Sequence, residues 1–529
     1  MELHGTELLQ LTGLLAAMGA LLALAPVLRV PYPILLVVGG LGIAFVPGLP
    51  RFELPPDVVL LAILPPLLYS AAFFTSIRDV RQNVRAIGAL SIGVVAATMV
   101  AVAAVAHWAI EGLPWSAAFV LGAIVSPTDP IAATSIASRL GVPRRVISVV
   151  EGESLVNDAT ALVFFRTAVV ATVAGTFSLW EASTRLVLNA VAGIAIGLAV
   201  GFVIRQVRRK VHDPPTEITI ALLTGYLAYL PAAALGVSGV LAAVASGLYM
   251  GWYTPELTTP QVRLQGNAFW SILTYVVNAI LFSLVGLQLP SVLDGIHGWS
   301  WSELLGAAAA VCGTVIVVRL LLTVPFAYVP PALLGMHRRG DPAPWREGLI
   351  VGWSGLRGAV SLAAALAIPL STAAGAPFPD RELIVFLAFS VILATLVLQG
   401  LSLPLLIRAL RVEDDGGAAY EESKARLRAA QAGLARVEEL ASEDWVREDT
   451  AERVRGGYRF RIDRFSERFG KGDGSVEERS QAYQRLRHEL LRAEQDAVVE
   501  LRRNGVISDD VMHRVLRDIA LEDVRLDAR

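Results

Sequence analysis

Polar and acidic side chains interrupt a stretch of the chain, residues 145–173, that is otherwise typical of a membrane-spanning helix. Within the segment EGESLVNDA they are Glu151, Glu153, Ser154, Asn157 and Asp158. A carboxylate at the centre of a bilayer costs about 3 kcal/mol or more, so it persists mainly where it has a partner, a cavity or a role in transport. Asp158 is therefore the first candidate for function.

The spacing of these residues divides them between two faces of the helix. At 100° per residue, Glu151, Ser154 and Asp158 share one stripe, whereas Glu153 and Asn157 form a neighbouring stripe. We expect the first stripe to contribute to a site and the second to need partners. Glu151 lies nearest the helix start, and we expect it to be solvated.

An ion site requires further oxygen atoms, and the preceding helix offers them. Asp158 and Ser154, together with Asp129 and the carbonyl of Thr128, would form an all-oxygen site suited to a hard monovalent cation. The sequence places no nitrogen or sulfur ligand near these residues. The predicted metal ligands are therefore Asp158, Asp129, Ser154 and Thr128, and the metal is a monovalent cation.

The two buried acids have structural alternatives. For Glu153 the natural partner is Arg357, the cation of a later Gly-rich segment, and such a pair would be structural; alternatively, Glu153 is solvated at a helix end. Asp158 could itself be a packing carboxylate, paired with Arg166 or with Arg319. Both arginines are better suited to pairing than to binding a cation, which they would repel.

Composition identifies the class of protein. The 529 residues are 54% hydrophobic with a mean hydropathy of +0.57, which indicates an integral membrane protein. The single cysteine, Cys312, excludes an intrachain disulfide and a thiolate metal site. The N-terminal sequence lacks the basic region of a cleaved signal peptide, so we expect the first apolar run to be a retained span.

At about 20 apolar residues per span, the sequence predicts thirteen membrane helices. They lie near residues 7–27, 33–48, 57–75, 84–108, 116–137, 145–173, 184–205, 217–235, 237–252, 266–290, 302–329, 347–369 and 382–408. Arginine and lysine concentrate in alternate loops, which predicts an outside N-terminus and a cytoplasmic C-terminus in the cell (inner) membrane.

Two of these spans contain helix-breaking residues at corresponding positions. In the fifth span, Pro127 and Pro130 flank Thr128 and Asp129, and the twelfth contains GWSGLRGA around Arg357. Each interrupted helix is the fifth helix of a six-span half, and one linker span lies between the two halves. Proline and glycine are common in membrane helices, but matched breaks favour an inverted-repeat secondary transporter. The predicted fold is thus all-α and polytopic, with two broken crossing helices.

A charged tail follows the membrane domain. Residues 412–529 hold 49 charged side chains in 118 positions, against 43 in residues 1–411. We therefore predict a membrane antiporter domain (1–411) and a cytosolic helical domain (412–529), with amphipathic helices separated by GKGDG. The tail either regulates transport or forms a bundle, packed on itself or on a second protomer. Its mixed charges do not indicate nucleic-acid binding.

The segment SPTDPIAATSIASRLGVPRRVISVVEGESLVNDATALVFFR resembles the signature of the sodium/proton exchanger family, in its electroneutral bacterial branch. ILPPLLYSAAF and GWSGLRGAVSLA support the resemblance. It implies that Asn157 and Asp158 mark the ion site and that Asp158 binds either cation or proton. It also implies coordinating or shaping roles for Thr128, Asp129 and Ser154.

The resemblance further implies a buried pair of Glu153 and Arg357, and a homodimer in the lipid bilayer. Some family members place an acid at the position of Ser70, so the cation preference of this chain is open. We expect electroneutral 1:1 exchange of Na⁺, with Li⁺ or K⁺ possible, for a proton in pH homeostasis, without a cofactor and without enzymatic catalysis.

The sequence also has features of two other classes of protein. The sequence Gly352-Trp353-Ser354-Gly355 matches the GxSG pattern of intramembrane serine proteases, but no histidine is placed to act as its general base. A cation channel, or a transport-derived sensor whose tail reports ion occupancy, is compatible with the same sequence. Voltage-driven flux would indicate a channel, and absence of flux a sensor.

Overall fold

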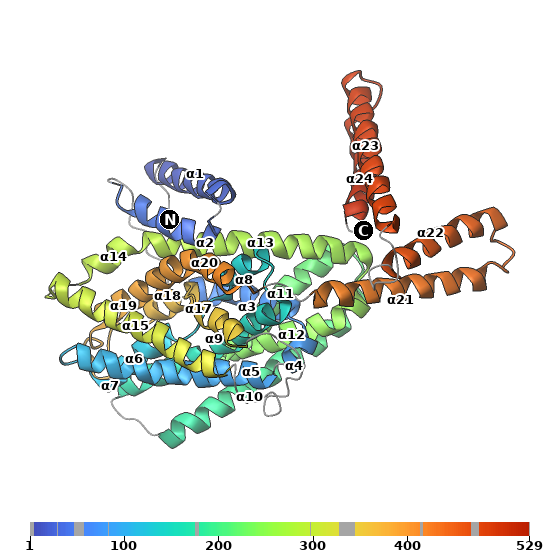
Figure 1. Cartoon of the computed structure of the whole chain (residues 1–529). Helices are drawn as coiled ribbons and strands as arrows, with labels where there is room; N and C mark the ends of the chain where they lie inside the picture. Colours follow the sequence, from blue (N-terminus) through green and yellow to red (C-terminus); the bar gives the residue numbers. More distant parts are fainter. Residues whose placement is uncertain are drawn as a thin grey trace. The chain divides into compact units, whose positions relative to one another are not determined.

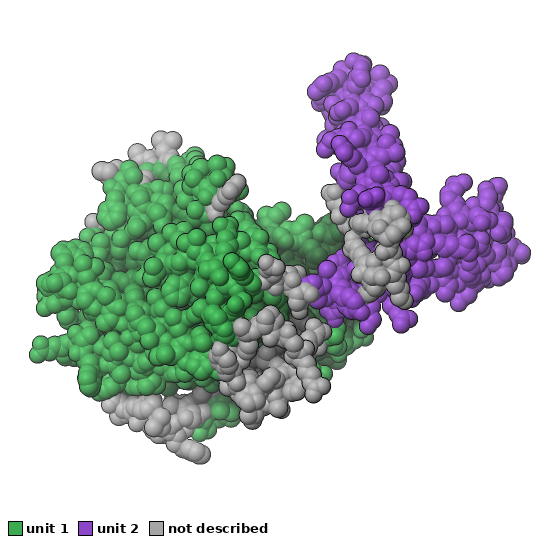
Figure 2. Space-filling model, in the orientation of Figure 1, with its two compact units in different colours: residues 1–413 green, residues 414–529 purple. Residues whose placement is uncertain are grey.

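A computed structural model describes residues 5–28, 30–46, 58–82, 84–174, 179–296, 298–326, 344–412, 416–466 and 475–527. Within these ranges the chain is helical, and its β structure is confined to an isolated antiparallel bridge between Ser371 and Pro377. The chain forms two compact units, residues 1–413 and 414–529 (Figure 2). The boundary predicted from charge lay between residues 411 and 412.

The first unit contains the apolar helices (Figure 1). They are α1 (Gly5–Leu28), α2 (Tyr32–Ala44), η1 (Val58–Ile63), α3 (Leu64–Phe74), α4 (Ile77–Gln82), α5 (Val84–Gly88), η2 (Ala89–Val94), α6 (Val95–Ala109), α7 (Trp115–Val125), α8 (Pro130–Arg139), α9 (Arg144–Ala174), α10 (Leu179–Arg208), α11 (Pro214–Ala234), α12 (Gly239–Leu257), α13 (Pro260–Leu287), α14 (Leu289–Asp294), α15 (Trp301–Phe326), α17 (Pro344–Trp353), α18 (Ala359–Leu366), α19 (Arg381–Ala394), η3 (Thr395–Gln399) and α20 (Gly400–Leu410). The η segments are π-helical.

In the described part of the chain, eight helical stretches are long and apolar enough to cross a membrane, and three shorter apolar helices accompany them. Every predicted span coincides with at least one helix of the first unit. The all-helical membrane fold is confirmed. The count of thirteen crossings stays a prediction.

Both predicted helix breaks are present. The fifth predicted span consists of α7 and α8, separated at 126–129, and the twelfth consists of α17 and α18, separated at 354–358. Pro130 is the first residue of α8, where its missing N–H is not needed. The two breaks meet, because the backbone N–H of Asp129 donates to the carbonyl of Leu356 at 2.7 Å.

The helices of the first unit pack as two groups. The broken-helix bundle comprises α5–α9 and α15–α20, and its core includes Val102, Leu121, Val311 and Leu387. The supporting bundle comprises α1–α3 and α10–α13, with α13 lying along α2 (Figure 1). The two groups meet where α9 contacts α3 and α12, where α2 contacts α8, and where α13 contacts α18.

Glycines set the spacing of the supporting bundle. On α10, Gly193, Gly197 and Gly201 recur every fourth residue and face α12. A Cβ atom at Gly197 would overlap the carbonyl oxygen of Ala242. Close backbone approach of this kind increases van der Waals contact, which drives helix association in lipid, where tails and side chains are equally apolar.

The second unit contains α21 (Gly417–Leu440), α22 (Glu448–Ser466), α23 (Ser475–Arg503) and α24 (Asp509–Asp527). The pairs α21–α22 and α23–α24 each form an antiparallel hairpin. Arg455 pairs with Glu438 in the first, and His488 Nδ1 lies 2.7 Å from Asp523 Oδ1 in the second. The GKGDG segment predicted to separate two tail helices lies outside the described residues.

We predict that Gly197→Ala destabilises the protein, because the added methyl group must displace the backbone of α12. Overpacking of this kind costs about 1–3 kcal/mol. Thermal unfolding in detergent would measure the loss. Gly306→Ala in α15 is the matched control, since nothing lies within 4 Å of its Cβ position. Equal melting temperatures for the two variants would contradict close α10–α12 packing.

Candidate cation site

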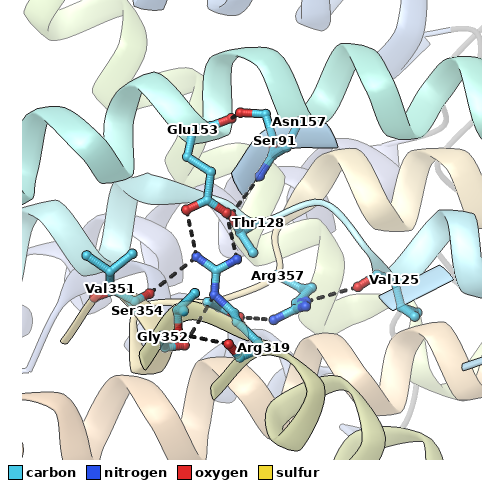
Figure 3. A network of polar contacts seen from close by, with 12 residues as sticks. Ser91, Val125, Thr128, Glu153, Asn157, Arg319, Val351, Gly352, Ser354 and Arg357 are labelled. Carbon is cyan, nitrogen blue, oxygen red and sulfur yellow. Dashed lines mark hydrogen bonds and ion pairs between the residues drawn. The ribbon is translucent and has the colours of Figure 1, made fainter. Parts of the chain in front are cut away.

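The acidic segment lies on α9, and one hydrogen bond ties it to the first helix break. The Asn157 amide Nδ2 donates to Thr128 Oγ1 at 2.8 Å (Figure 3). Both residues are buried, as is Ser154, whereas Asp158 is half-buried. The structure therefore brings the predicted residues of α9 next to the unwound segment 126–129.

Several buried oxygen atoms at this position have no partner. Among the described residues, Ser154 Oγ and Asn157 Oδ1 accept or donate no hydrogen bond. In the same part of the structure, Asp158 makes neither a hydrogen bond nor an ion pair, although its carboxylate interacts electrostatically with Asp129. Buried polar groups are nearly always satisfied, so unpaired oxygens beside a carboxylate call for a ligand.

Asp129 occupies the crossing point of the two broken helices. Its Oδ1 accepts from the backbone N–H of Ile131 at 2.9 Å, which makes Asp129 the N-cap of α8. Gly358, the N-cap of α18, lies against the same carboxylate so closely that a Cβ atom would overlap Oδ2. One negative charge thus faces the positive N-terminal ends of both half-helices.

The predicted ion pair of Glu153 with Arg357 is wrong. Glu153 pairs instead with Arg319 of α15, whose Nη1 and Nη2 lie 2.6 and 2.9 Å from Oε1 and Oε2 (Figure 3). The two side chains are 1% and 2% exposed. The same pair removes Arg319 as a partner for Asp158, so that structural alternative also fails.

The two arginines satisfy carbonyl groups at the ends of the broken helices. Arg357 Nε donates to Val125, the last residue of α7, at 3.0 Å, and its Nη1 donates to Gly355. Arg319 donates to Gly352 and Val351 at the end of α17, at 3.2 and 3.3 Å. The last carbonyls of a helix lack partners within it and carry its negative end, so a cation is stabilised there.

The backbone of Arg357 is also bonded to η3. Its own N–H donates to Thr395 Oγ1 at 3.2 Å. The sequence suggests Arg319 only as a partner of Asp158, because its position in the eleventh predicted span carries no spacing signal that links it to Glu153. Gly358 was recognised as a breaker but not as the surface that contacts Asp129.

The remaining sequence candidates occupy separate positions. Glu151 is exposed, as expected, and Ser70 is buried on α3, where its hydroxyl donates to the carbonyl of Leu67. Ser354, the first residue after α17, donates to the carbonyl of Ile350, and in the described structure no histidine or acid side chain hydrogen-bonds to it. A serine nucleophile would need such a base.

The donor set decides which kind of metal the site could hold. Within the described ranges, no group of three or more His, Cys, Asp or Glu side chains converges. The candidate ligands are the carboxylates of Asp129 and Asp158, the hydroxyl of Ser154 and the amide oxygen of Asn157, all hard oxygen ligands. This combination fits a monovalent cation better than a polyvalent ion.

Comparison with known proteins places these features in a family. Residues 13–409 match the family model described as sodium/hydrogen exchanger, transmembrane. An uncharacterised Na⁺/H⁺ exchanger of Mycobacterium tuberculosis (strain ATCC 25618 / H37Rv) is 37% identical over 506 residues, covering 94% of this chain and 92% of the relative. A sodium, potassium, lithium and rubidium/H⁺ antiporter of Bacillus pumilus is 36% identical, covering 71% of this chain and 58% of the relative.

The fold matches a solved structure. The sodium proton antiporter MjNhaP1 from Methanocaldococcus jannaschii superposes with a TM-score of 0.58 at 18% sequence identity, covering 77% of this chain and 99% of that chain. At that identity the likeness concerns the fold alone.

We predict that Arg319→Met destabilises the protein by about 3–5 kcal/mol, because Glu153 is left as a buried, uncompensated charge. The double variant Arg319→Met/Glu153→Leu should unfold closer to wild type than Arg319→Met alone. Chemical unfolding in detergent measures both. Arg145→Met is the control, since the Arg145–Glu347 pair is 36% and 23% exposed and should contribute about 1 kcal/mol or less.

The same series tests the identity of the partner. Glu153→Leu should not restore the stability of Arg357→Met, because Arg357 binds backbone carbonyls and not Glu153. Rescue of Arg357→Met without rescue of Arg319→Met would refute the pairing.

Proposed function

The chain belongs to the sodium/hydrogen exchanger family, and on that basis we propose that it exchanges one monovalent cation for one proton across the cell membrane. The observation that carries the proposal is the state of Asp158. It is a half-buried carboxylate without a bonded partner in the described structure, beside the unpaired oxygens of Ser154 and Asn157. A cation or a proton would complete this site.

Competition for one carboxylate would couple the two ions. A cation bound to Asp158 would also be coordinated by oxygens of Ser154, Asn157 and the unwound segment 126–129. A proton would neutralise the same carboxylate without these oxygens. Each ligand removes the uncompensated charge, and neither can bind while the other is present. The bundle would then cross between its two states only when Asp158 is occupied.

Stoichiometry follows from the number of titrating groups. Asp129 caps α8 and contacts the start of α18, so we propose that it keeps one protonation state through the cycle. Asn157 cannot titrate and is engaged with Thr128. One carboxylate then exchanges one proton for one monovalent cation, and the membrane potential does not drive the cycle.

Alternating access requires one group of helices to move relative to another. The site residues belong to the broken-helix bundle, in which the Arg319–Glu153 pair and the Asp129–Leu356 bond connect α9, α15 and both breaks. These buried bonds favour motion of the bundle as a unit. The supporting bundle, held by close glycine contacts on α10, would be the fixed partner.

Na⁺ is the proposed cation, with Li⁺ and K⁺ as candidates. The names of several relatives include Na⁺/H⁺ antiporters, and that of the Bacillus pumilus protein includes potassium, lithium and rubidium. Carboxylate, hydroxyl and carbonyl oxygens bind all of these ions. Selectivity would depend on the size of the space between α9 and residues 126–129.

We further propose that the protein is a homodimer of the cell membrane, with its N-terminus outside and its tail in the cytoplasm. The basic loops support this orientation. The transported ions would be its only ligands, with no cofactor and no nucleic acid. A regulatory role of the tail is part of the proposal.

We predict that Asp158→Asn abolishes exchange. The amide still offers an oxygen but can neither lose a proton nor neutralise a cation. The measurement is the cation-induced pH change in proteoliposomes, with Na⁺, Li⁺ and K⁺ added in turn. Glu256→Gln, an exposed charge at the end of α12, is the control and should transport normally. Normal exchange by Asp158→Asn would refute the assignment.

The same assay separates the alternatives. Exchange that is unchanged by an imposed membrane potential supports the electroneutral antiporter. Flux driven by voltage would indicate a channel, and absence of flux in the wild type would indicate a sensor.

We predict that the apparent cation affinity falls as pH drops, because a ligand that must be deprotonated binds its ion less well in acid. Once Asp158 is mostly protonated, the half-saturating Na⁺ concentration should rise about tenfold per pH unit, while the maximal rate at saturating Na⁺ stays constant. Initial rates between pH 6 and 9 in proteoliposomes, a range set by the assay, would measure both. A half-saturating concentration that is independent of pH would contradict direct competition.

A further inference from the structure

The tail helix α23 carries an apolar stripe that no part of its own unit covers. The stripe consists of Tyr483, Leu486, Leu490, Ala493, Ala497 and Leu501. Its four large members are 52%, 59%, 44% and 42% exposed. At 100° per residue these six positions fall within about 80° of one another, so they form a continuous line on one side of the helix.

The stripe is distinct from the face that packs on α24. That face contains the buried Leu491 and the residues that bond to α24, namely Gln484, Arg487 and His488. It lies about a third of a turn from the stripe. Leu501 lies 18 positions after Tyr483, so the stripe is about 27 Å long at a rise of 1.5 Å per residue. Helix α23 therefore has one face that packs on α24 and a separate apolar stripe.

The order of side-chain sizes along the stripe is self-complementary. Large residues occupy its N-terminal half, and Ala493 and Ala497 occupy its C-terminal half. If a second α23 runs antiparallel, Leu490 faces Ala493 and Leu486 faces Ala497, so in the middle of the stripe each leucine meets an alanine, while Tyr483 meets Leu501 at each end. Knobs then enter holes at an even spacing along the whole line.

The charges beside the stripe argue against a lipid surface. Antiparallel pairing would bring Arg485 of one helix near Glu500 of the other, and would also bring Glu489 near Asp496, so the charges neither favour nor exclude that orientation. Helices that lie on membranes have predominantly basic flanks, whereas here Glu489, Asp496 and Glu500 accompany Arg485 and Arg492. The flanks therefore fit a protein partner of mixed charge, which a second copy provides.

We propose that the α23 stripe binds the same stripe of a second copy of this chain, antiparallel, and so joins two tails. Because a two-fold interface is isologous, each contact between two different residues occurs twice. This association is independent of the transport mechanism, since no residue of the stripe belongs to the cation site.

Cysteine crosslinking in membranes that contain the full-length chain tests the geometry. The natural cysteine is first replaced by Cys312→Ser. In an antiparallel pair, Leu490→Cys should crosslink to itself with a short bismaleimide, because the two copies lie about 5 Å apart along the axis. Tyr483→Cys should not crosslink to itself, because its copies are about 26 Å apart.

Co-expression supplies the complementary result. Protomers with Tyr483→Cys and protomers with Leu501→Cys, distinguished by tags, should crosslink to each other. Self-crosslinking of Tyr483→Cys would show a parallel pair and overturn the proposal. Absence of crosslinks at Leu490 in a chain that still transports cations would overturn it as well.

A charge introduced into the stripe provides an independent test. In the Leu490→Cys background, Leu486→Lys should reduce crosslinking at least fivefold, since it places a cation in the apolar contact. Val506→Lys is the matched control, because Val506 is 67% exposed but lies beyond α23. Equal crosslinking in the two variants would refute the role of the stripe, whatever the outcome of the transport assays.

Discussion

Every other feature of the membrane unit depends on how the ends of two interrupted helices are satisfied away from water. Each break exposes backbone groups that the helix no longer pairs, and in lipid no solvent replaces the missing bonds. The chain answers with three charged side chains. Asp129 lies at the two N-terminal ends, and Arg357 and Arg319 lie at the C-terminal ends of α7 and α17.

This arrangement explains why a buried ion pair accompanies the site. Arg319 donates to carbonyl groups of α17, and Glu153 supplies a bidentate carboxylate that matches its buried charge. Ser91 holds the same turn of α9 by donating to the Glu153 carbonyl at 3.0 Å. With Glu153 paired to Arg319 and Asp129 bonded at the start of α8, Asp158 is the acid of this region that has no bonded partner in the described structure. Its lack of a bonded partner is therefore a consequence of how completely its neighbours are paired.

Close packing connects this local network to the helices around it. Gly358 allows the second break to touch Asp129, and glycines on α10 bring the supporting helices together. The contact of Gly358 with Asp129 holds the two breaks together. The α10 glycines hold the supporting bundle together, and the broken-helix bundle would move against it. In the second unit, the apolar stripe of α23 is left uncovered by α24, and we propose that a second copy of the chain covers it.

The sequence alone determined the all-helical membrane fold, both helix breaks and the face of α9 that carries Asp158. These follow from local rules: apolar length, the missing N–H of Pro130, and a period of 3.6 residues. It could not determine the partner of Glu153, because Arg319 and Arg357 lie 166 and 204 residues away and nothing in their spacing ranks them. Only the tertiary structure decided that Arg357 caps α7, that Arg319 reaches α9, and that Ser154 and Asn157 keep oxygens free beside Asp158. Those outcomes depend on how the helices cross, which is fixed by long-range packing and not by local sequence.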